Sequence, residues 1–184
     1  LHLPEQYIKG KLGVGLGGRR NGNDGRIQKL SLGNFDFPGV VTSFQDVDDS
    51  WLQQKEKFRN GILGNELLSR FEIYFNYAAG QILLKPYQEK QKPFVMDRSG
   101  MFLFAYGLQF NQFVVRDILE NGPAQQADIR VDDILTRIRG MSAKYFTLDG
   151  INQVLQRKPG KKINLYLLRG KETLRKQIVL RDLI

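Results

Sequence analysis

The chain offers few of the side chains that enzymes use as nucleophiles or general bases. It has no cysteine, which excludes disulfides, thiol catalysis and cysteine-ligated metals. Its one histidine, His2, stands beside the first residue, so we expect neither a histidine-rich zinc site nor a serine–histidine pair. Serines are present, but no candidate base lies at a recognisable spacing from any of them. We therefore expect no metal or other cofactor.

Two carboxylates that share one proton can activate a water molecule without a nucleophilic side chain or a metal. Aspartic proteases hold each of these carboxylates in an Asp-Thr-Gly or Asp-Ser-Gly turn, and the sequence contains neither turn. Its Asp-Gly pairs are Asp24-Gly25, in a stretch predicted to be a polar loop, and Asp149-Gly150, in a predicted helix. We therefore assign no catalytic residue.

A glycine-rich stretch, GVGLGG (13–18), raises the alternative of phosphate binding. Phosphate-binding loops need a helix directly after the glycines, and the P-loop also needs a Lys-Ser/Thr pair. Neither follows here, so the glycines favour a hairpin or a flap.

The elements that would position any site fall into two halves. With 184 residues, 41% of them hydrophobic, the chain can form one large or two small packed domains. The stretch KPYQEKQKP (85–93) carries two prolines and charges but almost nothing apolar, which predicts a boundary near residues 88–91. We expect domains at 1–88 and 92–184. No apolar run approaches the roughly 20 residues of a membrane span.

The net charge of +9 is concentrated in the second half. Residues 1–90 hold 12 basic and 10 acidic side chains, whereas 91–184 hold 16 and 9. Basic clusters at 157–162 and 169–176 can mark a nucleic-acid surface. However, Phe102, Phe104 and Tyr106, which alternate as a stacking platform would, lie elsewhere in the sequence. We interpret the clusters as solvated hairpin ends and do not expect nucleic acid as a partner.

The first half has a β pattern with one short helical stretch. Strands are predicted at 7–18, 25–33, 37–46 and, on either side of a turn at 78–80, within 71–86. Ile62 and Leu63 are predicted to form a buried strand that enters a turn at Gly64. A short helix follows, with Asn65 as its N-cap.

The second half alternates strands with two helical stretches. Strands are predicted at 94–97, 100–107, 111–119, 133–140 and, around Gly170-Lys171, at 162–184. The segment NGPAQQADIRVDDILTRIRG (121–140) leaves one strand, makes about one helical turn and enters the next. A longer helix is predicted at 147–160, with Thr147 as N-cap and Pro159-Gly160 as its end.

This second half resembles the PDZ domain of bacterial exported proteases. The resemblance rests on the Pro-Ala step before a short helix, the turn at 131–133, the strand 134–140 and the order of elements over 92–184. Asp128 and Asp132 stand where that family has glycine. We expect both to adopt left-handed backbone, which aspartate tolerates better than most residues but less well than glycine, in a turn that is strained or slightly reshaped.

The resemblance implies a groove in which a peptide adds as a strand between 101–106 and the helix 148–156. The peptide's terminal carboxylate would bind the backbone of the loop 98–103, where Gly100 allows close approach and Arg98 supplies charge. An apolar peptide end is expected. The implied peptide-binding residues are Arg98, Gly100, Met101, Phe102, Leu103, Leu148, Asn152 and Leu155. For Leu155, a place in the core is an equal alternative.

The first half resembles the C-terminal part of a bacterial retropepsin-like aspartic protease domain. The resemblance rests on Ile62-Leu63-Gly64 before a short helix and on the strand FEIYFNY (71–77) that follows. It implies a fold that is mainly β with short helices: a partial retropepsin-like β-barrel followed by a PDZ-like domain. In that family the catalytic Asp turn precedes these strands, and Ile62, Leu63 and Gly64 would support the active site.

These resemblances predict the C-terminal fragment of a bacterial aspartic peptidase, inactive alone, whose PDZ-like domain captures peptide or protein C-termini. The alternative is a non-catalytic peptide-binding scaffold. The resemblance also implies a location in the cell envelope or periplasm, and a homodimer through the partial protease domain.

Overall fold

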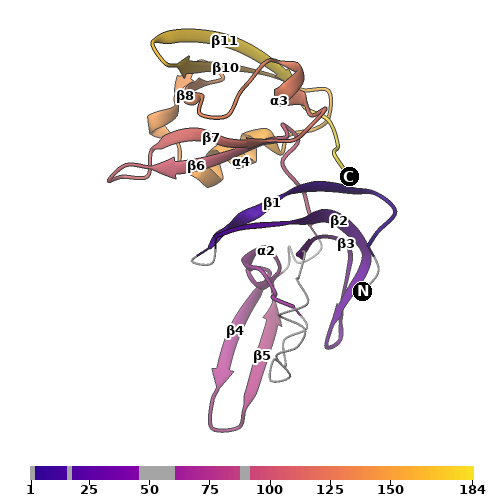
Figure 1. Ribbon diagram of the computed structural model, residues 1–184. Coiled ribbons are helices and arrows are strands. Elements are labelled where there is room, and N and C mark those ends of the chain that lie inside the picture. Colours follow the sequence, from indigo (N-terminus) through magenta and orange to yellow (C-terminus); the bar gives the residue numbers. More distant parts are fainter. Residues whose placement is uncertain (1–2, 16–17, 46–60, 88–91) are drawn as a thin grey trace.

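The computed structural model describes residues 3–15, 18–45, 61–87 and 92–184, and it is mainly β with short helices (Figure 1). The first half contributes a three-stranded sheet in the order β1-β2-β3 and a separate hairpin, β4–β5. The second half forms one sheet in the order β11-β10-β8-β7-β6, with the short β9 beside β8. No sheet spans the predicted boundary among these residues, although the division into two domains stays a prediction.

The middle strand of the first sheet, β2, is longer than its sequence pattern predicts. The three strands of this sheet are β1 (Tyr7–Gly15), β2 (Gly18–Leu32) and β3 (Phe35–Gln45). The predicted polar loop around Asp24-Gly25 is wrong, because these residues lie inside β2. Gly25 pairs with Tyr7 of β1 on one side and with Thr42 of β3 on the other. A strand paired on both sides satisfies its backbone groups, which outweighs the turn preference of Asn, Asp and Gly.

The segment that enters helix α2 (Asn65–Leu68) is not the predicted buried strand. Residues 61–64 form no strand, and the exposed fractions of Ile62 and Leu63 are 88% and 44%. The N-cap is Gly64 and not Asn65, which is the first helical residue. Apolar character alone predicted burial here, but the described residues provide no surface that covers this segment.

Strands β4 (Phe71–Asn76) and β5 (Gln81–Pro86) form the predicted hairpin. Its base packs into a small core made by Phe37, Val40, Leu67, Phe71 and Phe94. Its tip carries exposed Phe75 and Tyr77, whose rings stack at 6.0 Å. A homodimer through this half stays a prediction.

Residues 94–97 do not form the predicted strand. Phe94 instead packs edge-to-face against Phe37 at 6.3 Å, and the Arg70 guanidinium lies 3.6 Å from the centre of the Phe94 ring. Arg26 of β2 donates hydrogen bonds to the carbonyl oxygens of Gly39 and Phe94, at 2.6 and 3.0 Å. Side-chain packing and these hydrogen bonds hold residues 94–97 in place. The segment therefore forms no strand, although its residues alternate.

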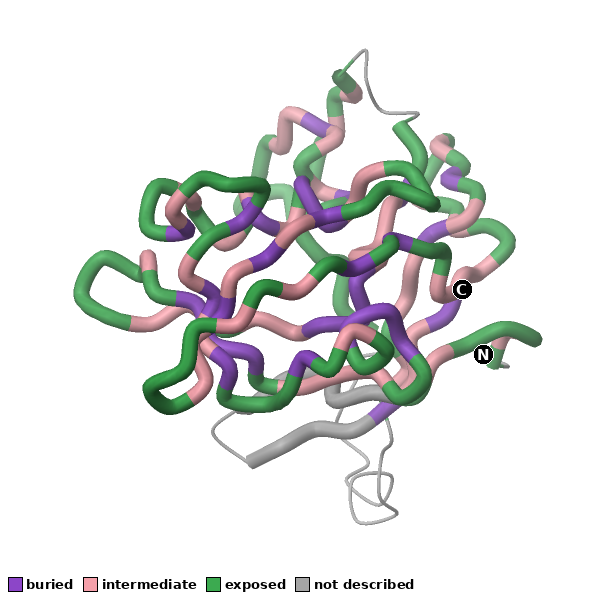
Figure 2. The backbone as a smooth tube through the Cα atoms, turned by 90° about the horizontal axis from the view of Figure 1, so that it is seen from above, coloured by how far each residue is buried: buried purple, intermediate pink, exposed green. Residues whose placement is uncertain are grey.

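The second half encloses the larger core. Figure 2 shows which segments of the tube are buried and which are exposed. The strands of this half are β6 (Met101–Tyr106), β7 (Gln112–Ile118), β8 (Ile134–Ile138), β9 (Met141–Ser142), β10 (Lys162–Arg169) and β11 (Glu172–Val179). Between β9 and β10 lie the short 3-10 helix η1 (Ala143–Tyr145) and helix α4 (Leu148–Leu155). As predicted, Thr147 caps α4: its hydroxyl oxygen accepts from Gly150 N at 3.1 Å.

The turn between β7 and β8 confirms the expected backbone. Helix α3 (Pro123–Gln126) is a single turn whose Ala124 is fully buried. Asp128 and Asp132 have φ values of 52° and 69°, so both aspartates occupy the left-handed region in place of glycine.

A buried ion pair holds this turn to the sheet. Asp133 is fully buried, and its carboxylate accepts from Arg169 Nε at 2.7 Å and from Arg169 Nη2 at 2.8 Å. The amide of Arg130 also donates to Asp133, at 2.9 Å. Burial raises the pKa of Asp133, but these hydrogen bonds outweigh it and hold the pKa below its ordinary value.

Candidate peptide-binding site at the edge strand β6

Strand β6 is an edge of the second sheet. In the described part of the chain it pairs with β7 only, in antiparallel register, and α4 lies beside it (Figure 1). Arg98 N donates to the carbonyl oxygen of Leu155 at 3.1 Å, which fixes the C-terminal end of α4 next to the start of β6. Leu148 is therefore at the opposite end of the helix from the loop that precedes β6.

The strand alternation divides the predicted peptide-binding residues between the core and the edge. Met101 and Leu155 are 4% and 0% exposed and belong to the core, so neither presents a surface to a ligand. Leu103, Ala105 and Leu148 are partly buried and pack against that core. These three residues give an apolar strip along the free edge, beside half-buried Asn152 of α4; we call it the β6 groove, after the groove that the resemblance implies.

Phe102 and Phe104 lie on the opposite face of β6 from the core. Phe104 is 53% exposed, and the Arg116 guanidinium lies 5.8 Å from the centre of its ring. The alternating aromatic pattern of this strand therefore does not line the β6 groove.

The loop before β6 turns through Gly100, whose φ is +68°. A Cβ at this position would lie 3.3 Å from Leu119 Cβ and 3.4 Å from Gly122 Cα, so close packing as well as the left-handed backbone favours glycine. Backbone bonds then secure the loop: Leu119 N donates to Gly100 O at 2.8 Å, and Ala124 N donates to Ser99 O at 2.9 Å.

Arg98, which the resemblance assigned to a peptide carboxylate, has other partners in the structure. Its Nε donates to Asp182 at 2.5 Å, and its Nη1 donates to the carbonyl oxygens of Gln156 and Arg157 at 2.5 and 3.3 Å. These carbonyls follow α4 and have no helical partners, so the guanidinium caps the helix's negative end.

Sequence reasoning did not find Asp97, which occupies the centre of this loop. Its Oδ1 accepts hydrogen bonds from Ser99 N at 2.8 Å, from the Ser99 hydroxyl at 2.6 Å and from Gly100 N at 3.2 Å. Its Oδ2 is buried without a hydrogen-bond partner. Burial raises the pKa of Asp97 to about 6 against the opposing effect of these bonds. Asp-x-Ser-Gly is the sequence signal that was available, because Asp commonly accepts from the amide two residues on.

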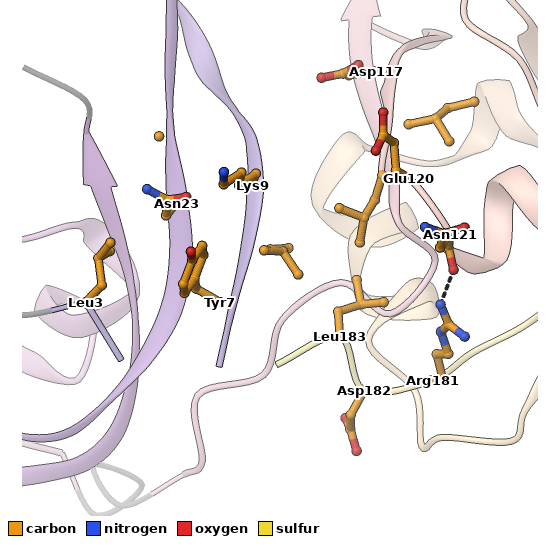
Figure 3. A pocket seen from close by; sticks show the side chains of 14 residues that line it. Leu3, Tyr7, Lys9, Asn23, Asp117, Glu120, Asn121, Arg181, Asp182 and Leu183 are labelled. Carbon is orange, nitrogen blue, oxygen red and sulfur yellow. Dashed lines mark hydrogen bonds between the residues drawn. The ribbon is translucent and has the colours of Figure 1, made fainter. Parts of the chain in front are cut away.

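A cleft of about 1120 Å³ separates the first sheet from the turn after β7 and the C-terminal segment (Figure 3). Its lining includes Tyr7 and Asn23 from the first sheet, and Glu120, Asn121 and Arg181 from the second half. Arg181 closes one wall by donating to Asn121 O. Acidic and basic side chains both line the cleft, so its charge favours neither an anionic nor a cationic ligand.

The structure leaves the catalytic predictions untested. Among the described residues no group of three or more His, Cys, Asp or Glu could hold a metal ion. No helix in the described part of the chain has both the length and the apolar character to cross a membrane. Ile62, Leu63 and Gly64 are exposed before α2, and their support of an active site stays a prediction.

No protein-family model matches the chain, and no curated protein matches it. Solved structures similar to it include an HtrA-type protease, AlgW, with a decapeptide. That likeness has 17% identity and a TM-score of 0.45, and it covers 96% of this chain and 54% of that one. A serine endoprotease from Yersinia pestis is 26% identical over 46% of this chain and 30% of its own, with a TM-score of 0.35.

A third similar structure is a C-terminal processing protease of photosystem II. It is 21% identical over 45% of this chain and 22% of its own, with a TM-score of 0.42. The chain thus spans less than two thirds of the length of each of these proteins. With TM-scores below 0.5 these likenesses identify no family. None of the three is named as an aspartic protease. They therefore give no support to the resemblance of the first half to retropepsin-like aspartic proteases.

Proposed function

We propose that this chain captures an extended peptide or protein segment by strand addition to β6. The observation that carries the proposal is the edge of β6 beside α4, which pairs with no further strand of the described residues and along which Leu103, Ala105 and Leu148 are partly exposed. An added strand would satisfy the free backbone groups of β6, and its alternate side chains would enter the apolar groove.

A PDZ-like domain over residues 92–184 is the more specific form of this proposal. It is supported by the element order from β6 to β11, by the single-turn α3 and by the left-handed Asp128 and Asp132. A location in the cell envelope is part of the same proposal and rests on the family resemblance alone.

Leu148→Asp tests the groove. A carboxylate at this half-buried position would face the apolar side chains of a bound peptide, and an unpaired charge there costs about 1–3 kcal/mol or more. We expect the affinity for an apolar, strand-forming peptide to fall at least about tenfold, measured by fluorescence anisotropy with a labelled peptide.

Val179→Asp is the matched control for that variant. Val179 lies on β11, the other edge strand, and is 47% exposed, so its replacement carboxylate stays hydrated. Equal loss of affinity in both variants would place the peptide elsewhere. Unchanged binding by Leu148→Asp would remove the groove from the proposal.

The second candidate function is a part in proteolysis, through a first half that belongs to a retropepsin-like domain. The observation that favours it is the order Ile62-Leu63-Gly64, α2 and the β4–β5 hairpin, with apolar Ile62 and Phe75 exposed as in an incomplete barrel. The sequence has no Asp-Thr-Gly or Asp-Ser-Gly turn, so in this proposal the chain contributes structure and not the catalytic carboxylates.

This chain alone should therefore cleave no peptide bond. Hydrolysis needs an activated water, and the sequence supplies neither a paired-carboxylate turn, nor a cysteine, nor a histidine placed for a triad. The measurement is turnover of a denatured protein substrate from about pH 3 to 8, with and without pepstatin. Cleavage that copurifies with the chain would contradict the prediction, and its response to pepstatin would show whether paired carboxylates carry it out.

A further inference from the structure

Three consecutive backbone amides where the loop enters β6 already have acceptors within the chain. Ser99 N and Gly100 N donate to Asp97 Oδ1, at 2.8 and 3.2 Å, and Met101 N donates to the Ser99 hydroxyl oxygen at 3.1 Å. That hydroxyl donates in turn to Asp97 Oδ1 at 2.6 Å. Two of the amides and the hydroxyl thus donate directly to one carboxylate, and the third amide reaches it through the hydroxyl.

This arrangement has the chemistry of an anion-binding nest. Successive N–H groups around a left-handed residue, here Gly100 at φ +68°, form a concavity that favours negative charge. The anion is the chain's own Asp97 side chain. A peptide carboxylate would have to displace it before it could accept from the same amides.

Displacement is opposed by the burial and the anchoring of the loop. Ser99 is fully buried and Met101 is 4% exposed, so an incoming ligand has little access to their amides. Four backbone hydrogen bonds hold the loop from both sides. They join Arg98 N to Leu155 O, Ala124 N to Ser99 O, Leu119 N to Gly100 O and Arg181 N to Arg98 O.

We infer that the β6 groove accepts an internal extended segment and does not require a free C-terminal carboxylate. The inference rests on the proposed strand addition and specifies its ligand. The edge of β6, which no other described strand covers, supplies main-chain hydrogen bonds, and Leu103, Ala105 and Leu148 select apolar side chains at alternate positions. Neither contact depends on a chain end. The ligand class is therefore an apolar, β-prone stretch within an unfolded protein.

The experiment compares three N-terminally labelled peptides of one alternating valine–threonine sequence. One ends in a free carboxylate, one in an amide, and one continues into a Ser-Gly-Ser extension. We expect their dissociation constants to agree within about twofold, whereas a charged hydrogen-bonded contact would separate them by about tenfold or more. At least tenfold tighter binding of the free acid would overturn the inference and leave the proposed strand addition intact. Failure of all three to bind would overturn both.

Asp97→Ala tests the part assigned to that side chain. It empties the nest, so the free acid should gain affinity over the amide by about threefold or more. A thermal melt shows whether the variant is folded. If it is not, the comparison of the three peptides on the wild-type protein decides whether a free carboxylate is needed. An unchanged ratio in a folded variant would show that Asp97 does not exclude the carboxylate.

Discussion

Replacing Arg169 with methionine should lower the free energy of unfolding by about 3–5 kcal/mol at neutral pH. Arg169 binds the fully buried Asp133 through Nε and Nη2, at 2.7 and 2.8 Å. The same guanidinium donates to the carbonyl oxygen of Asp128 at 2.8 Å. Methionine would fill much of the volume but leave the Asp133 carboxylate buried without its cation, and that uncompensated charge dominates the cost.

The pH dependence of this loss distinguishes it from a packing defect. In the wild type the pKa of Asp133 is held below its ordinary value, so its stabilising contribution is present above that value and is lost as the pH falls through the folded pKa. Without Arg169, burial would raise the same pKa. The difference in stability between wild type and variant should therefore shrink from pH 7 toward pH 4.

Arg130→Met is the matched control. The Arg130 side chain pairs at 2.8 Å with the exposed Asp128, whereas only its backbone amide reaches Asp133. Solvent and salt screen an exposed pair, so urea unfolding should place this variant close to wild type. Adding Asp133→Asn to Arg169→Met should recover part of the loss, because no buried charge remains. Equal costs for Arg169→Met and Arg130→Met would refute the argument.

Local rules predicted the second half well. Thr147 capped its helix, and Asp128 and Asp132 took left-handed backbone, because each outcome depends on a few neighbouring residues. The buried pair of Asp133 and Arg169 was missed, since 36 positions separate the partners and neither residue type favours burial.

The errors in the first half have a common physical origin. Gly25 was placed in a loop and Ile62 in a buried strand from residue type alone. The actual outcome depended on neighbours distant in sequence: β1 and β3 pair with the strand that contains Gly25, and no described surface covers Ile62. Phe94 likewise packs into the core of the first half. The alternating pattern of residues 94–97, which predicted a strand, gives no sign of this contact.

The site itself was predicted only in outline. The edge strand and the helix beside it follow from element order, which the sequence shows. Whether Leu155 faces the groove or the core depends on the packing of α4, and it lies in the core. The position of the Arg98 side chain depends on Asp182, 84 positions away, which sequence spacing does not reveal. Asp97 was missed although its partner Ser99 lies only two residues on.

Asp97→Asn should abolish a component of stability that decreases as the pH rises. The pKa of Asp97 is raised from 3.8 to about 6, mainly by burial, so the folded protein binds the proton more tightly than the unfolded chain does. The resulting stabilisation is complete below about pH 3.8 and is lost as the pH rises through about 6, a total of about 3 kcal/mol. Roughly half of this loss falls between about pH 5 and 7.5.

Asparagine keeps the acceptor for the amides of Ser99 and Gly100 but has no proton to titrate in this range. The other described aspartates with shifted pKa values, Asp36, Asp128 and Asp133, are shifted downward, so their contributions change only in more acidic solution. The Arg98 guanidinium is directed to Asp182 and not to Asp97. Urea unfolding at pH 5 and 7.5 should show wild type losing about 1.5 kcal/mol more than Asp97→Asn over that interval. Parallel pH profiles for the two proteins would mean that the Asp97 carboxylate is ionised in the nest at both pH values, with a pKa near its ordinary value.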